Sequence, residues 1–191
     1  RFHAVGNRVI IVGRTEEKLA AAAAALPGVS TRIADVSMAS DRDRLIADHS
    51  DVSILVNNAG IQNITTILQS AGEDIEHEIN VNLLAPVLLC HGFLPALLQR
   101  ESAAIVNVSS GLALAPKQTA SIYCASKAAL HSFSKTLRWQ LEGTCVKVFE
   151  VLPPIVDTAM TAGRGRAKIT PAQLAEEFWR KFERDRFEMR I

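Results

Sequence analysis

Short apolar runs alternate with longer stretches of helical character along the whole chain. Runs rich in valine, isoleucine and leucine, too short for helices, are typical of strands buried on both faces of a parallel sheet. They lie at residues 8–12, 30–36, 52–56, 104–108 and 146–152, and another begins at 187. The alternation predicts an α/β fold: a doubly wound, Rossmann-type parallel sheet with helices on both faces.

The intervening stretches carry helix signals. Thr15 can cap a helix, and Pro27 with Gly28 can end it. Two prolines, Pro86 and Pro95, are expected to kink or break a long helical region. The predicted helices lie at residues 15–25, 40–49, 72–99, 121–141 and 171–184.

A sheet of this kind normally opens with a strand and a glycine-rich turn, whose backbone N–H groups hold a pyrophosphate. No such turn precedes Arg8, and residues 1–6 resemble the end of the helix that should follow it. The last predicted strand is cut short at Ile191. We therefore expect residues 1–191 to belong to one domain that is a fragment, or has its ends left out, with the N-terminal strand and glycine-rich loop absent.

One pair of side chains suggests acid/base chemistry. Tyr123 is the only tyrosine, and Lys127 follows it by four residues, so both lie on one helix face. A nearby ammonium favours the phenolate, although a phenol with a pKa of about 10 needs a shift of up to ~3 units, roughly 4 kcal/mol, to act as a base near pH 7. The alternative is a solvated pair on an exposed face.

Polar residues follow two of the predicted strands. Ser110 comes after the strand at 104–108, and the turn at residues 57–60 follows the strand at 52–56. Sites in open α/β sheets form at the carboxyl ends of strands. Ser109 competes with Ser110, but strand alternation points the two to opposite faces, so only one can line a site.

Ser110, Tyr123 and Lys127, with Asn82 and the turn Asn57-Asn58-Ala59-Gly60, resemble the short-chain dehydrogenase/reductase family. The resemblance covers nearly the whole chain, and the segments at 13–19 and 153–158 are most similar to the oxidoreductases named after the D-alanyl-lipoteichoic acid operon. It implies that Tyr123 is the acid/base, that Lys127 lowers its pKa and bonds the nicotinamide ribose, and that Ser110 orients the substrate oxygen. It also implies that Asn82 holds a water in a proton relay; by itself Asn82 would be a structural asparagine.

The resemblance also implies a nicotinamide cofactor. Arg14 ends the first predicted strand with no acid until Glu16, which favours NADP over NAD because an arginine accommodates a 2′-phosphate. An ordinary solvated arginine is the alternative. The other implied cofactor contacts are Asp35 and Val36 with the adenine, Asn58, Ala59 and Gly60 with the adenosine, and Pro153, Ile155 and Thr158 with the nicotinamide end, besides Tyr123 and Lys127. Pro154 stands where the family usually has glycine, and proline lacks the N–H for a backbone contact.

Composition narrows the possible partners. Nearly half of the 191 residues are apolar, enough for one domain with a sizeable core, and the net charge of +1 gives no reason to expect nucleic acid or a membrane as a partner. Cys90, Cys124 and Cys145 are odd in number, lie far apart in the sequence and form no Cys-x-x-Cys pair. This pattern indicates a reducing, cytoplasmic location. We expect no metal, since the histidines lack ligand spacing, and no apolar run appears long enough to span a membrane.

We therefore expect an NAD(P)-dependent oxidoreductase acting on a modestly sized, rather apolar carbonyl or alcohol, assembled as a homodimer or homotetramer. Two alternatives remain. A catalytically idle relative could act as a nucleotide-binding or sensing module, and a lyase or epimerase could use the same Tyr/Lys pair. The intact Ser/Tyr/Lys set disfavours the first, and the short chain disfavours the second.

Overall fold

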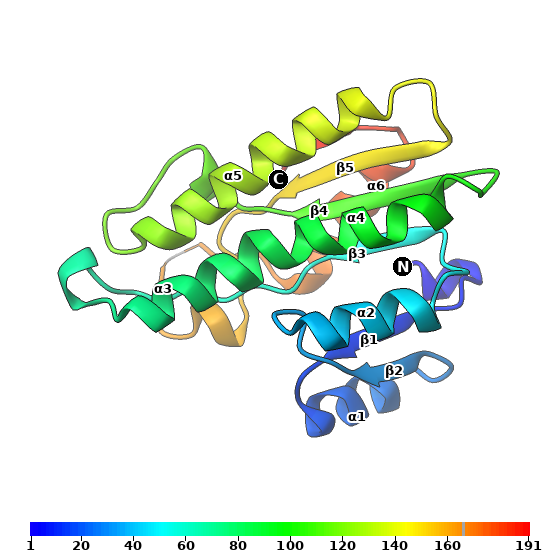
Figure 1. Cartoon of the computed structure of the whole chain (residues 1–191). Helices are drawn as coiled ribbons and strands as arrows, with labels where there is room; N and C mark the ends of the chain where they lie inside the picture. The colour runs from blue at the N-terminus through cyan, green and yellow to red at the C-terminus, as the bar shows by residue number, and fades with distance from the viewer. Residues whose placement is uncertain (166) are drawn as a thin grey trace.

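The computed structural model describes residues 1–165 and 167–191 and confirms the predicted α/β architecture (Figure 1). Parallel strands form two sheets, ordered β1-β2 and β3-β4-β5-β6. Helices cover both faces of the larger sheet, with α4 and α5 on one side and α6 on the other. The strands are β1 (Ile10–Gly13), β2 (Ser30–Ile33), β3 (Ile54–Asn57), β4 (Ala103–Val108), β5 (Val146–Leu152) and β6 (Glu188–Arg190).

The α-helices are α1 (Glu16–Ala25), α2 (Ala39–Asp48), α3 (Gly72–Ile79), α4 (Ala85–Leu97), α5 (Ser121–Gln140) and α6 (Pro171–Phe182). Short 3-10 turns occur at His3–Val5, Ile67–Gln69, Gly111–Ala113 and Ala159–Thr161. Strand β2 ends three residues before the predicted position, at Ile33. The Asp35 carboxylate accepts hydrogen bonds from the backbone N–H (2.9 Å) and the hydroxyl (2.7 Å) of Ser37, so the chain turns there instead of extending.

The helical region from Gly72 to Leu97 continues through Pro86 and Pro95, where the sequence predicts a kink or a break. It runs from α3 into α4 through a π-helical segment at Asn80–Leu84. A helical proline clashes with the carbonyl four residues earlier, which for Pro86 is that of Asn82, and the wider π segment accommodates this clash. By length and composition alone this helix could span a membrane, contrary to our expectation, yet α4 packs on the sheet as a core helix.

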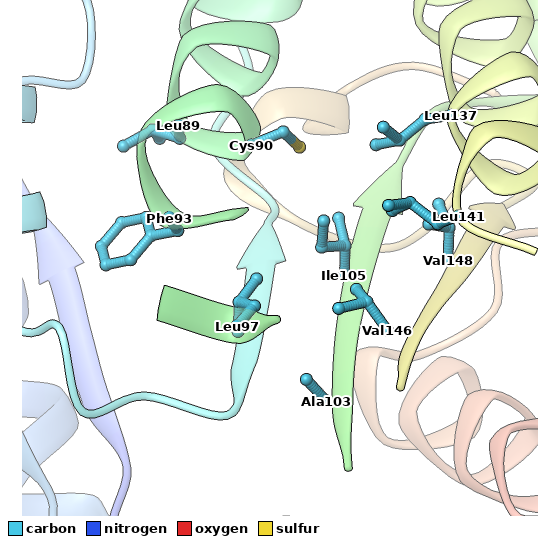
Figure 2. Packing of buried hydrophobic residues seen from close by; sticks show 10 residues of the cluster. All are labelled: Leu89, Cys90, Phe93, Leu97, Ala103, Ile105, Leu137, Leu141, Val146 and Val148. Atoms are coloured by element: carbon cyan, nitrogen blue, oxygen red, sulfur yellow. The ribbon is translucent and has the colours of Figure 1, made fainter. Parts of the chain in front are cut away.

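The main core lies between the sheet and helices α4 and α5 (Figure 2). Ile105 of β4 is fully buried between Leu97 of α4 and Leu137 of α5. On the opposite face, Phe149 of β5 packs against Phe182 of α6, with ring centroids 4.6 Å apart. Truncating such buried side chains to alanine costs about 2–5 kcal/mol. These two layers fix the positions of β4, β5 and α5, which carry the candidate site.

A groove of about 570 Å³ separates β1 from β3. In the described part of the chain no strand lies between them, so each presents an unpaired backbone edge. The β1-β2 pair is joined to the larger sheet through α2, whose Ile46 packs directly on Gly92 of α4. A Cβ at position 92 would lie 2.2 Å from Ile46 Cδ1, so any larger residue there would force the Ile46 side chain to move.

Candidate active site

The inward face of α5 carries a row of polar side chains one turn apart: Tyr123, Lys127 and His131. Tyr123 is 9% exposed and Lys127 is 3% exposed, so neither is a solvated surface group. The Lys127 ammonium lies 5.8 Å from the centroid of the Tyr123 ring and donates a hydrogen bond to the Val108 carbonyl (2.8 Å). Helix α5 therefore presents the predicted pair to the carboxyl end of β4.

Ser110 meets this pair from the end of β4. Its side chain is buried, accepts a hydrogen bond from the Leu112 N–H (3.1 Å) and lies within hydrogen-bonding reach of the Tyr123 phenol. Ser109 instead donates to the Glu150 carboxylate at 2.5 Å. The structure therefore brings Ser110, Tyr123 and Lys127 together. Both serines border the cavity, contrary to the expectation that only one can, but the hydroxyl of Ser109 is held by Glu150.

The electrostatics of the pair differ from our expectation. Burial raises the pKa of Tyr123, although the Ser110 hydrogen bond and the charge of Arg164 oppose this effect. Burial also lowers the pKa of Lys127 to about 8, against the opposing charge of Glu150. Desolvation of the Tyr123 phenol thus outweighs the expected stabilisation of the phenolate by the ammonium. At pH 7 Tyr123 is a neutral proton donor and Lys127 is mostly charged.

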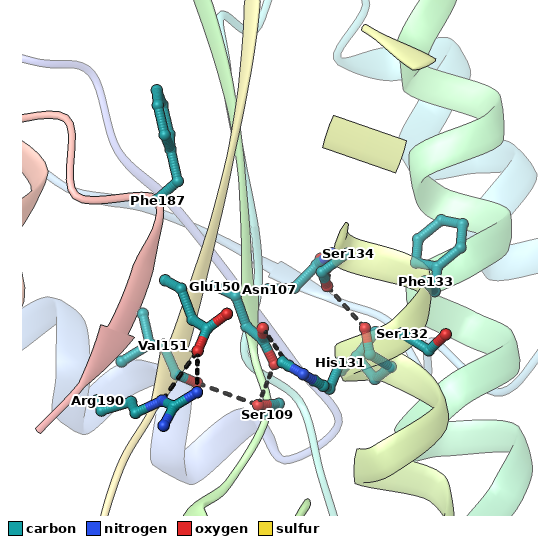
Figure 3. A network of polar contacts seen from close by, with 12 residues as sticks. Asn107, Ser109, His131, Ser132, Phe133, Ser134, Glu150, Val151, Phe187 and Arg190 are labelled. Carbon is teal, nitrogen blue, oxygen red and sulfur yellow. Dashed lines mark hydrogen bonds and ion pairs between the residues drawn. The ribbon is translucent and has the colours of Figure 1, made fainter. Parts of the chain in front are cut away.

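Glu150 of β5 supplies a countercharge to Lys127 from within the sheet. It is 1% exposed and accepts from the Ser109 hydroxyl, while its second oxygen pairs with His131 Nδ1 at 2.7 Å (Figure 3). His131 and Glu150, together with Glu188 of β6, place potential metal ligands within 4.8 Å of one another. Glu188 is already paired with Arg190 (2.7 Å), so the geometry supports an ion-pair network here and not a cation site.

Asn82 lies fully buried within the π-helical segment. Its side-chain oxygen accepts from the Ile61 N–H (2.9 Å), and its side-chain nitrogen donates to the Ile61 carbonyl (2.9 Å) and the Ser126 hydroxyl (3.2 Å). Asn82 therefore clamps the turn that follows β3. A Cβ at Gly60 would lie 3.3 Å from Asn82 Oδ1 and 3.6 Å from Lys127 Nζ, so this turn borders the ammonium directly.

A cavity of about 930 Å³ opens in front of these groups. It is bordered by the turn after β3, the end of β4, the loop after β5 and helix α6. The predicted site residues that line it are Asn58, Ala59, Gly60, Ser110, Tyr123, Lys127, Pro153, Ile155 and Thr158. Most of the predicted site therefore converges on one cavity, although the residues come from widely separated parts of the sequence.

The predicted adenine and 2′-phosphate contacts lie elsewhere. Arg14 and Asp35, at the ends of β1 and β2, form an ion pair at 3.4 Å outside this cavity. Burial pushes the pKa of Asp35 upward, but hydrogen bonds from Ser37 and the charge of Arg14 lower it overall. Val36 borders the groove between β1 and β3. Arg14 therefore has an anionic neighbour in Asp35, although its side chain is 53% exposed.

Three residues were missed in the sequence. Glu150 is a carboxylate within the apolar strand at 146–152, a pattern that signals a buried charge needing partners. His131 follows Lys127 by four residues on the same helix face. Arg164 lines the cavity from the loop after β5, and its position between Gly163 and Gly165 was the available signal.

Comparisons with known proteins show similarity in sequence and in fold. A family model described as short chain dehydrogenase matches residues 1–168. The "uncharacterized oxidoreductase DltE" of Bacillus subtilis (strain 168) is 45% identical over 166 residues, which are 84% of this chain and 66% of that protein. The chain thus spans just under two thirds of the length of this relative.

Solved structures are similar over almost all of the chain. A short-chain dehydrogenase from Sphingobium yanoikuyae in complex with NADPH has a TM-score of 0.91 at 28% identity, covering 99% of this chain and 80% of that one. The closed form of a serine dehydrogenase complexed with NADP+ has a TM-score of 0.88 at 26% identity, covering 99% of this chain and 85% of that one.

Proposed function

Because the chain belongs to the short chain dehydrogenase family, we propose that it is an NAD(P)-dependent oxidoreductase that interconverts a carbonyl and an alcohol. The observation that carries this proposal is the convergence of Ser110, Tyr123 and Lys127 at one cavity. A buried phenol that is neutral at pH 7 and faces a serine hydroxyl is suited to protonating a carbonyl oxygen.

The cavity fits a nicotinamide cofactor. Its volume of about 930 Å³ lies in the upper part of the range of about 300–1,000 Å³ that is usual for ligand sites. The glycine of the turn after β3 allows close approach to the Asn82 clamp and to Lys127. A bound nicotinamide would supply or accept the hydride. The groups proposed to hold it are Lys127 at the ribose, the turn residues Asn58, Ala59 and Gly60, and the loop residues Pro153, Ile155 and Thr158.

In reduction, Tyr123 would donate its proton to the substrate oxygen while Ser110 orients that oxygen. Lys127 would stabilise the phenolate that is left, and its ammonium lies close enough to do so. Asn82 would hold the turn beside the ammonium. In the role implied by the family, Asn82 would also hold a water molecule in a proton relay that reprotonates Tyr123. In oxidation the same groups would act in reverse.

We favour NADP over NAD. Arg14 lies at the end of β1, where it could pair with a 2′-phosphate after releasing Asp35. The two solved structures described above, complexed with NADPH and NADP+, are consistent with this choice.

We also propose a cytoplasmic homodimer or homotetramer. The three cysteines are free, as expected in a reducing compartment. Large apolar side chains remain exposed on the long helices, with Leu84 46% and Trp139 56% exposed, and a second copy could cover them.

The test of the reaction is turnover of a panel of carbonyl compounds with NADPH and NADH. We expect Tyr123→Phe to reduce turnover by at least about 100-fold, the usual contribution of general acid catalysis, and to leave NADPH affinity nearly unchanged. Wild-type rates in this variant would show that Tyr123 is not the acid/base. Cofactor binding without turnover of any compound would favour a binding module instead.

A further inference from the structure

The charge lining the cavity is of one sign. Among the described residues that border it are three cations, Lys117, Lys127 and Arg164, and no aspartate or glutamate. Lys127 is committed to the Val108 carbonyl and faces Glu150, while Lys117 is exposed on its loop. Arg164 is thus a half-buried cation, and none of the described residues that border the cavity is an anion that could pair with it.

The backbone holds Arg164 in a defined position. Its N–H donates to the Thr161 carbonyl (3.1 Å), and the glycines on either side have φ of 68° and 73°. These are left-handed conformations that favour glycine. A Cβ on Gly165 would lie 2.3 Å from Ile155 Cδ1, so the turn packs closely against Ile155, which lies earlier in the same loop. These backbone contacts indicate that Arg164 has a fixed position at the cavity and is not a solvated arginine on a flexible loop.

The Arg164 guanidinium has N–H donors that can bind a ligand. One nitrogen donates to the side-chain oxygen of Gln62 (3.0 Å), a neutral partner, and no carboxylate of the described residues pairs with it. A guanidinium has five N–H donors. Its charge is felt at the Tyr123 phenol, where it opposes the rise in pKa caused by burial. The nearby carboxylate of Glu78 is buried and accepts from the Asn63 N–H, so it does not neutralise Arg164.

We propose that Arg164 binds a carboxylate of the substrate, so that the enzyme acts on oxo acids or hydroxy acids with a short apolar body. This inference rests on the proposed function and names the substrate class of the same site. The planar guanidinium binds a carboxylate through two parallel hydrogen bonds, and Gln62 orients it. The carboxylate then lies at one end of the substrate, and the carbonyl lies at Tyr123. Apolar side chains such as Leu112, Met160 and Leu174 border the space around the body of the substrate.

The test compares acids with neutral esters that differ only in charge. Pyruvate, acetoacetate and levulinate would each be reduced alongside the corresponding methyl ester, with NADPH, by the full chain. We expect wild type to prefer at least one acid over its ester by at least about tenfold in kcat/KM, the size of a charge-assisted hydrogen bond. In Arg164→Gln this ratio should fall towards one, and Arg164→Lys should keep part of it.

A second variant leaves the arginine in place. Gln62→Glu puts a carboxylate beside Arg164, so it should compete with the substrate and lower the acid-to-ester ratio as Arg164→Gln does. Gln62→Met is the matched control: it removes the hydrogen bond without adding charge and should keep most of the preference. Equal preference for acid and ester in wild type, or a ratio that survives both Arg164→Gln and Gln62→Glu, would overturn the proposal.

Two further measurements separate this inference from the proposed function and from a role in cofactor binding. Titration calorimetry with butanoate and butanamide tests the anion site without turnover. Butanoate binding that Arg164→Gln abolishes would support the site even if no carbonyl were reduced, whereas turnover with no acid preference would overturn the site alone. If Arg164→Gln weakens NADPH binding and leaves the acid-to-ester ratio unchanged, then Arg164 serves the cofactor and the proposal is wrong.

Discussion

Replacing Lys127 with methionine should stabilise the cofactor-free protein while abolishing its proposed activity. Lys127 is 3% exposed, and burial lowers its pKa from 10.5 to about 8. This shift means that holding the charged form in the fold costs about 3 kcal/mol at pH 7. Methionine has a similar volume and no charge. It also leaves the Val108 carbonyl without its hydrogen bond, and this loss destabilises the folded variant by about 1 kcal/mol. We therefore expect the variant to be more stable by about 2 kcal/mol at pH 7.

The pH dependence gives the sharper signature. The folded-state pKa of Lys127 lies below its unfolded value, so the unfolded chain binds more protons between about pH 8 and 10.5. The cost is present in full below pH 8 and disappears as pH rises through this window. Over pH 7 to 9.5 wild type should gain about 2 kcal/mol relative to Lys127→Met.

Urea unfolding of both proteins at several pH values, without cofactor, measures this difference directly. Terms common to both proteins, such as the titration of Tyr123, cancel in the comparison. Lys135→Met is the matched control, because Lys135 lies on the same helix but is exposed; it should show no such pH dependence. A Lys127→Met protein that is less stable than wild type at pH 7, with a pH-independent difference, would refute the reasoning.

The remaining predictions concern the cofactor, the countercharge and the turn that holds Arg164. Arg14→Ala should weaken NADPH binding at least about tenfold and NADH binding much less, as measured by fluorescence titration; equal losses would remove the argument for a 2′-phosphate contact. Glu150→Gln should move the pKa of Lys127 below about 8, because the Glu150 charge raises it, and should shift the pH profile of turnover to lower pH. An unchanged profile would mean that Glu150 does not act on Lys127. Gly165→Ala should cost about 1–3 kcal/mol in urea unfolding, since φ is 73° and the methyl group meets Ile155; a cost near zero would show that the turn is loosely held.

The alternation of apolar runs and helical stretches was enough to predict the fold, because a parallel sheet covered on both faces leaves a strong pattern in sequence. Helical spacing placed Tyr123 and Lys127 on one face, and the carboxyl edge of the sheet brought Ser110 near them. Assigning these residues to one site depended on the resemblance to the short-chain dehydrogenase/reductase family, which also favoured Ser110 over Ser109. The direction of the Tyr123 pKa shift was not predictable from the sequence. It depends on how much water burial removes, and that is set by segments distant in sequence.

Other features depend on contacts that no local pattern encodes. Pro86 suggested a break, but a π-helical segment in the preceding turn absorbs its clash. Arg14 remains the predicted contact of a 2′-phosphate, but the structure adds a partner that the sequence did not reveal, Asp35 at the end of the next strand. The link between Glu150 and His131 crosses from sheet to helix. In each case a partner from another element decides the outcome.

The contact between Ile46 and Gly92 has a consequence for how the two ends of the proposed cofactor site are held relative to each other. Arg14 and Asp35 sit on the two-stranded unit, whereas Tyr123 and Lys127 sit on the four-stranded one. No backbone ladder among the described strands ties these units together, so their alignment depends on side-chain packing, to which the contact between Ile46 and Gly92 contributes. An alanine at position 92 would force Ile46 to move. We expect this to disturb the packing between the two units and to weaken the proposed dinucleotide binding, although position 92 lines neither the cavity beside Tyr123 nor the groove.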